Sequence, residues 1–190
     1  MSATTSAFED LLLDSPIIGA VKDEAGLEKV LASDCRIIFL LFGTVLNIQM
    51  LVEKAKQKNR MVFVHTDLIE GLSGKEIAID YLLQNTDADG IISTRINQIK
   101  YAKSVGLFCI QRFFVIDSLS FENVKKQASY ADAVDILPGT MPKIIDRLSK
   151  QLRKPIIASG LIQDKQDIMA ALGAGAHGVS TTCSNLWKEL

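Results

Sequence analysis

The segment from Lys154 to Thr182 restricts what this chain can fold into more than any other. It contains an apolar strand that ends at Gly160, a short helix over residues 164–172, and a second apolar strand that ends at Ser180. Two such strands joined by one helix form a βαβ unit with parallel strands. Small residues at both strand ends let a ligand approach the backbone. Near the end of a chain of βα repeats, this pattern predicts the phosphate site of a (βα)₈ barrel, formed after strands 7 and 8.

Six further apolar runs precede this unit, and a helical segment follows each of them. The expected strands are 16–21, 36–42, 61–65, 90–93, 107–114 and 133–137. The expected helices are 23–32, 43–58, 75–84, 94–104, 118–129 with Ser118 as its cap, and 141–152, with a brief final helix over 185–190. Eight repeats favour a small single-domain TIM (βα)₈ barrel over residues 1–190. An open flavodoxin-like sheet is the alternative, but it usually has about five strands.

Residues 1–14 form an N-terminal extension to the predicted barrel. The segment 1–7 is small and polar and is expected to be frayed, whereas 8–13 is amphipathic and would close the bottom of the barrel. The chain has 190 residues, 48% of them hydrophobic. This is short for an eight-fold barrel, for which about 250 residues is typical, so the loops must be lean.

Charge and cysteine content exclude several classes of protein. The formal net charge is −1, so we expect no DNA binding, and any RNA contact would come from a local patch. Three widely spaced cysteines (Cys35, Cys109 and Cys183) form neither a disulfide framework nor a metal motif, which favours a cytoplasmic location. There is no signal-peptide pattern and no apolar run long enough to span a membrane.

The carboxyl ends of the predicted strands carry a ring of polar and small residues. They are His65, Asp67, Ser93, Arg95, Gln111, Arg112, Asp135, Gly139, Ser159, Gly160, Ser180 and Thr181. In a barrel of this kind these ends face the ligand. Arginines together with free backbone N–H groups suit a phosphate-bearing ligand. The alternative is a polar rim that merely caps the barrel.

The residues point to no catalytic constellation. Only two histidines are present, His177 is expected to be structural, and no cluster has the spacing of metal ligands. No serine or cysteine lies in a nucleophile elbow, and none of the strand ends carries a lysine. Active sites do occupy this face in barrel enzymes. An enzyme acting on a small phosphate ester (an isomerase, lyase or phosphodiesterase) therefore remains the alternative function.

Two clusters of basic residues could contact RNA phosphates. Lys143, Arg147 and Lys150 recur at helical spacing and predict a basic stripe on one helix. The second cluster spans residues 54–60. A solvated outer helix face is the alternative for both clusters. The longest predicted loop, 66–74, contains two glycines and is our candidate for a mobile element.

Several stretches in fixed order resemble the glycerol uptake operon antiterminator proteins of bacteria. They are 65–72, 90–95, 110–118, 135–143, 155–162 and 179–182, the last followed by Leu186 and Trp187. The resemblance implies a small barrel that senses glycerol 3-phosphate and binds the leader mRNA of glycerol-catabolism genes. It implies no catalysis and no cofactor. A sensor that signals to a protein partner, and assembly into a homo-oligomer, stay open.

The resemblance also implies roles for individual residues. Gly139, Gly160, Ser180 and Thr181 would form the phosphate cup. The rest of the pocket would consist of His65, Asp67, Arg95, Gln111 and Arg112. At two positions the chain departs from the family pattern, with Arg95 where lysine is expected and Asp135 where a longer glutamate is usual. An arginine keeps the charge but changes the donor geometry.

Overall fold

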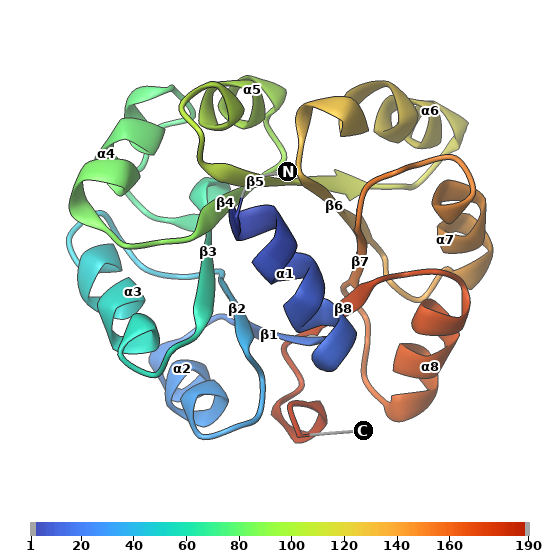
Figure 1. The fold of residues 1–190 in the computed structure, drawn as a ribbon, viewed down its shortest axis with the longest axis horizontal. Coiled ribbons are helices and arrows are strands. Elements are labelled where there is room, and N and C mark those ends of the chain that lie inside the picture. Colours follow the sequence, from blue (N-terminus) through green and yellow to red (C-terminus); the bar gives the residue numbers. More distant parts are fainter. Residues whose placement is uncertain (1–2, 189–190) are drawn as a thin grey trace.

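Eight parallel strands close into a barrel in the computed structural model, which describes residues 3–188 (Figure 1). Each strand pairs with its neighbour in the chain, and β8 pairs with β1. The strands are β1 (Ile17–Val21), β2 (Ile37–Leu40), β3 (Met61–His65), β4 (Gly90–Ser93), β5 (Phe108–Phe114), β6 (Ala133–Leu137), β7 (Ile156–Ser159) and β8 (Gly178–Thr181). The predicted TIM barrel is confirmed.

Helices surround the barrel, and one further helix lies across its centre (Figure 1). The α-helices are α1 (Ala3–Asp14), α2 (Glu24–Leu31), α3 (Ile48–Lys56), α4 (Ile77–Asn85), α5 (Ile96–Ser104), α6 (Ser118–Gln127), α7 (Pro142–Ser149) and α8 (Lys165–Gly173). Three short 3₁₀ helices are η1 (Thr66–Leu68), η2 (Ala128–Tyr130) and η3 (Ser184–Leu186). No helix within residues 3–188 is long and apolar enough to cross a membrane.

Alternation along each strand divides the core into two layers. Phe39 and Phe63 belong to the cluster inside the barrel, whereas Ile38 and Val62 belong to the cluster between the strands and the helices. Because both faces of every strand are covered, the strands are mostly apolar, and their polar residues lie toward the carboxyl ends. The same alternation decides which polar residues at the strand ends reach the interior.

Helix α1 closes the amino-terminal end of the barrel. The ring of Phe8 lies 5.3 Å from that of Phe63 and 5.0 Å from that of Phe108, measured between ring centres. Leu12 packs against Gly178, where a Cβ atom would lie 2.7 Å from the leucine Cδ2. The segment 8–13 therefore closes the barrel as predicted. Residues 3–7 belong to this helix, however, and are not frayed, whereas residues 1–2 of the segment predicted to be frayed lie outside the described residues.

Some helix boundaries differ from the prediction for local reasons. The helix predicted from residue 43 begins at Ile48, because the preceding residues form a turn in which the Asn47 side chain accepts the N–H of Thr44. The cap of α6 is Asp117 rather than Ser118, since the Asp117 carboxylate accepts the N–H of Ser120 in a capping box. The predicted final helix is only the 3₁₀ turn η3, and part of that prediction lies outside the described residues.

Candidate functional site

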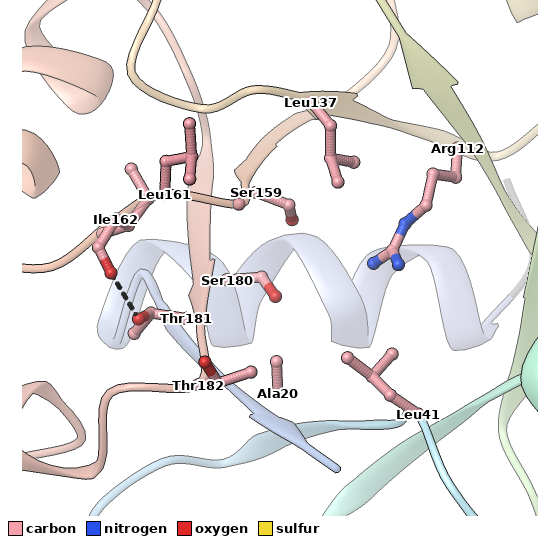
Figure 2. A pocket seen from close by; sticks show the side chains of 11 residues that line it. Ala20, Leu41, Arg112, Leu137, Ser159, Leu161, Ile162, Ser180, Thr181 and Thr182 are labelled. Carbon is pink, nitrogen blue, oxygen red and sulfur yellow. Dashed lines mark hydrogen bonds between the residues drawn. The ribbon is translucent and has the colours of Figure 1, made fainter.

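A cavity of about 120 Å³ opens at the carboxyl ends of β1, β5, β7 and β8 (Figure 2). This is well below the roughly 300–1,000 Å³ of sites for drug-sized ligands, so it suits a small molecule. Its lining comprises Ala20, Leu41, Arg112, Leu137, Ser159, Gly160, Leu161, Ile162, Ser180, Thr181 and Thr182. Of these, the sequence predicted Arg112, Ser159, Gly160, Ser180 and Thr181.

Arg112 is the charged residue in this lining. Its Nε donates a hydrogen bond of 2.6 Å to Oδ2 of Asp135, and both side chains are buried, with 8% and 0% of their surface exposed. The two residues are direct neighbours in the register of β5 and β6. The terminal guanidinium nitrogens have no partner among residues 3–188 and point into the cavity (Figure 2). Asp135 therefore holds the guanidinium so that two nitrogens face a ligand.

Two serines complete the polar part of the cavity. Ser159 ends β7 and Ser180 lies beside it on β8, and both hydroxyls point toward the space that Arg112 enters (Figure 2). The Ser159 hydroxyl is buried and has no hydrogen-bond partner. An unpaired buried polar group costs about 1–3 kcal/mol. A ligand that accepts a hydrogen bond from Ser159 would remove this cost.

The loop after β7 holds an unusual backbone conformation. Gly160 has φ +77° and Leu161 has φ +61°, so two consecutive residues lie in the left-handed region. This conformation costs about 1–2 kcal/mol for a residue other than glycine. No residue within 3–188 accepts a hydrogen bond from the N–H groups of residues 160–162. Unpaired N–H groups in such a turn form a concave site for an anion.

Gly139 does not line the cavity, in contrast to the prediction. Its N–H donates to the carbonyl oxygens of Ser159, at 2.6 Å, and Gly160, at 3.1 Å. A Cβ atom at this position would lie 2.8 Å from the backbone nitrogen of Ser159. Gly139 thus lets the loop after β6 pack directly on the end of β7, and its N–H is already used.

Gln111 faces away from the barrel interior. It is buried between β5 and α6, where its Nε2 donates to Oε1 of Gln127 at 2.7 Å. The prediction that it joins the pocket is wrong, because neighbouring residues of a strand point to opposite faces and Arg112 takes the inward position. Thr181 also points outward, and its hydroxyl donates to the carbonyl oxygen of Ile162 at 2.8 Å. This bond fixes the loop after β7.

His65 ends β3 on the inner face and is 3% exposed. Burial, and then the charge of Arg112, lower the pKa of His65 to about 4, while Asp67 acts in the opposite direction. The imidazole is therefore neutral at pH 7. Its Nδ1 lies 3.9 Å from Oδ2 of Asp67 and has no hydrogen-bond partner. Neither His65 nor Asp135 is part of the cavity lining, in contrast to the prediction, although both lie on the inner face of the barrel.

Asp67 anchors the start of α5 and does not line the cavity. Its carboxylate accepts the N–H of Thr94 at 2.7 Å, the hydroxyl of Thr94 at 2.8 Å and the hydroxyl of Ser93 at 2.9 Å. Burial raises the pKa of Asp67, but these hydrogen bonds outweigh burial and hold the pKa below its usual value. Arg95 is half-exposed, with its Nε 3.6 Å from Asp67 and its guanidinium packed on Gly74. Arg95 does not line the cavity either.

The loop 66–74, our candidate for a mobile element, is tied to its neighbours. Glu70 forms backbone hydrogen bonds with Gly43 and Val45, at 3.0 and 2.8 Å. The buried Gln98 donates to the carbonyl oxygen of Ser73 at 3.1 Å and accepts the hydroxyls of Thr66 and Ser93. Sequence analysis missed Gln98, because a glutamine within a helix carries no signal that its amide is buried.

The predicted basic residues have different surroundings. The Arg147 guanidinium lies over the ring of Phe121, 4.4 Å from its centre, and Lys150 pairs with Asp146 at 2.7 Å. Lys143 is exposed and has no partner among residues 3–188. In the second cluster, Lys54 and Lys56 pair with Glu28 and Asp89. The described residues contain no group of three side chains suited to hold a metal ion.

Comparison with known proteins identifies relatives along nearly the whole chain. The family model of the glycerol-3-phosphate responsive antiterminators matches residues 17–187. YgcP of Escherichia coli K12, an uncharacterised protein, is 42% identical over 179 residues, which cover 93% of this chain and 94% of YgcP.

Two solved structures are also similar to this chain. The glycerol uptake operon antiterminator regulatory protein of Listeria monocytogenes is 33% identical with a TM-score of 0.86, and the match covers 92% of this chain and 95% of that one. A glycerol uptake operon antiterminator-related protein of Thermotoga maritima is 29% identical with a TM-score of 0.80, covering 90% and 96%.

Proposed function

Because the chain belongs to the family of glycerol-3-phosphate responsive antiterminators, we propose that it senses glycerol 3-phosphate and binds leader mRNA in response. The effector would occupy the cavity at the carboxyl ends of the barrel strands. The observation that carries this proposal is the cluster of unpaired donors around one small cavity. The cluster consists of the Arg112 guanidinium, the Ser159 hydroxyl and the backbone N–H groups of residues 160–162.

The donors suit the phosphate end of the effector. A phosphate carries close to two negative charges and accepts several hydrogen bonds. Arg112 offers two nitrogens in a planar fork, which matches two phosphate oxygens. The N–H groups of the loop after β7 and the hydroxyls of Ser159 and Ser180 would bind the remaining oxygens.

Two buried, unpaired polar atoms of residues outside the cavity lining suit the glycerol end. Oδ1 of Asp135 is buried without a hydrogen-bond partner, and so is Nδ1 of the neutral His65. A polyol hydroxyl can donate to the carboxylate oxygen, and it can donate to or accept from the imidazole nitrogen, depending on the tautomer. A ligand with a phosphate at one end and hydroxyls at the other would therefore satisfy polar atoms that are unpaired in the free protein.

The family is regulatory, and we propose a sensing rather than a catalytic role, exerted in the cytoplasm without a cofactor. The RNA target would be the leader of a glycerol-catabolism transcript, with no role for DNA. Binding to RNA through local patches would be strengthened by assembly into a homo-oligomer, because several weak patches then act on one transcript.

One titration tests the proposal. Fluorescently labelled leader transcript is titrated with the protein at several salt concentrations, with and without glycerol 3-phosphate. We expect the effector to raise RNA affinity, and the logarithm of the affinity to fall linearly with the logarithm of the salt concentration. Glycerol and inorganic phosphate serve as control ligands. RNA affinity that ignores the effector, or turnover of glycerol 3-phosphate, would contradict the proposal.

A further inference from the structure

A second hollow of about 380 Å³ lies between α6 and α7, outside the effector cavity. Its floor includes Phe121, Met141 and Ile144, and its rim carries Ile116, Asp117 and Arg147. We call it the α6–α7 groove. Glu122 also lines the groove and pairs with Lys125 at 2.6 Å. An apolar floor with one cation and two carboxylates differs from the uniformly charged track that binds only phosphates.

Arg147 and Phe121 form a stacked pair at one side of this groove. The guanidinium carbon lies 4.4 Å from the centre of the Phe121 ring, and Arg147 is exposed. The guanidinium thus lies over the ring while the Arg147 side chain stays accessible to solvent. Unstacked RNA bases bind by stacking on aromatic rings and on guanidinium planes of this kind.

Asp117 and Lys143 carry opposite charges, so they would bind different parts of a nucleotide: Asp117 the base and Lys143 the phosphate. Asp117 caps α6: its carboxylate accepts the N–H and hydroxyl of Ser120, and these bonds, together with the backbone N–H of Leu119, hold the pKa of the carboxyl group below its usual value, so it is an acceptor at the groove rim. A carboxylate accepts the amino groups of a base and repels phosphate. Lys143 precedes Arg147 by one helical turn and is exposed and unpaired among the described residues. Phosphates would therefore lie along Lys143, and the base would enter the groove.

From this arrangement, and resting on the proposed RNA-binding function, we propose that the α6–α7 groove binds one unpaired base of the leader RNA. The base stacks on the Arg147 guanidinium and presents an amino group to Asp117. Lys143 contacts the adjoining phosphate. The site thus has a defined chemistry, an amino-bearing base in a single-stranded segment.

The groove is physically connected to the effector cavity. Strand β5 contains Arg112, which lines the cavity, and Val115, which lines the groove, follows the last residue of this strand. The N–H of Val115 donates to the carbonyl oxygen of Leu137 at 2.8 Å, and Leu137 lines the cavity. Met141, four residues after Leu137, lines the groove. Effector binding at Arg112 and Leu137 therefore acts on two segments that also form the groove walls.

Substitutions at Arg147 separate stacking from charge. In the presence of saturating glycerol 3-phosphate, Arg147→Gln should weaken binding of the labelled leader transcript at least about five-fold. Arg147→Lys keeps the charge but loses the plane, so it should also weaken binding several-fold with an unchanged salt dependence. Lys143→Gln should lower the slope of log affinity against log salt by about one. The control Lys126→Gln removes an exposed cation of α6 outside the groove and should change affinity less than two-fold.

The outcomes distinguish this inference from the proposed function. All four variants should retain wild-type affinity for glycerol 3-phosphate in calorimetry, which also shows that they fold. If wild type binds the transcript and both Arg147 variants bind it equally well, the groove does not hold a base, while the sensing function stands. Loss of self-association instead of RNA affinity would make the groove a protein contact and overturn the inference. If wild type binds no RNA, both proposals fail.

Discussion

Asp135 holds Arg112 by a hydrogen bond of 2.6 Å, and the two residues face each other across the register of β5 and β6. The carboxylate is fully buried, so it depends on the guanidinium for its charge partner. The same pair leaves two guanidinium nitrogens free for the effector. One contact thus contributes both to the stability of the barrel and to the cavity.

Arg112→Ala should weaken glycerol 3-phosphate binding by at least about 100-fold, since hydrogen bonds to charged groups contribute about 1.5–3 kcal/mol each. It should also lower the free energy of unfolding by about 3–5 kcal/mol, because it leaves Asp135 charged, buried and unpaired. Calorimetry and urea unfolding measure the two effects. The double variant Arg112→Ala with Asp135→Asn should recover stability without recovering affinity. Intact effector affinity in either variant would move the phosphate site elsewhere.

Ser159→Ala should have opposite effects on the free and the bound protein. It removes a buried hydroxyl that has no partner, so the free protein should gain about 1 kcal/mol of stability. The effector should bind several-fold more weakly, because one donor is lost. Thermal unfolding with and without glycerol 3-phosphate measures both effects.

Ser33→Ala is the matched control for that experiment. The Ser33 hydroxyl donates to the carbonyl oxygen of Val30 at 2.7 Å, so its loss should destabilise the protein and leave effector affinity unchanged. A Ser159→Ala variant that binds the effector like wild type would show that this hydroxyl makes no ligand contact.

Leu161→Gly should stabilise the free protein by about 1 kcal/mol, because glycine adopts the observed φ of +61° without steric cost. Effector affinity should change less than about two-fold, because the substitution keeps the backbone N–H. Asn59→Gly, at the other non-glycine residue with positive φ, should give a smaller gain, because asparagine tolerates this conformation. A lower melting temperature for Leu161→Gly would contradict the assignment of strain to this residue.

His65 should make the free protein less stable as the pH falls from about 6.5 to about 4. Its pKa in the folded protein is lowered from 6.5 to about 4, so the unfolded chain binds more protons within this window. Across this window the free energy of unfolding should fall by about 3 kcal/mol as the pH decreases. Asp67 acts at lower pH. Because its pKa in the folded protein is lowered from 3.8, its stabilising contribution is lost as the pH falls below about that value.

Urea unfolding at a series of pH values measures the effect of His65. His65→Gln should remove the part of the pH dependence that lies between pH 6.5 and pH 4. Equal pH dependence in the variant and in wild type would show that His65 does not titrate in this way.

The strands were predictable from sequence because each one is buried on both faces and is therefore mostly apolar. Ser159, Gly160 and Ser180 were predictable because β7 and β8 are short apolar strands that end in small residues. Gln111 was not, since Gln111 and Arg112 are both polar and neither reveals which one faces inward. The role of Gly139 depends on a contact with Ser159 twenty residues later, which no local pattern reports.

Asp67 illustrates a different limit. It follows β3 by two residues, which suggested a place in the pocket. The 3₁₀ turn η1 instead directs its carboxylate to the start of α5, where it meets Ser93 and Thr94. A single turn of the chain therefore converts a candidate ligand contact into a structural one.

Helix α1 gives the barrel a blind end. Phe8 and Leu12 fill the amino-terminal opening of the barrel. A molecule bound near Arg112 therefore enters and leaves through the carboxyl-terminal end. A partner that covers the carboxyl-terminal end slows dissociation of the effector without contacting it. Residence time, as well as affinity, is therefore a property that a partner at this end of the barrel can set.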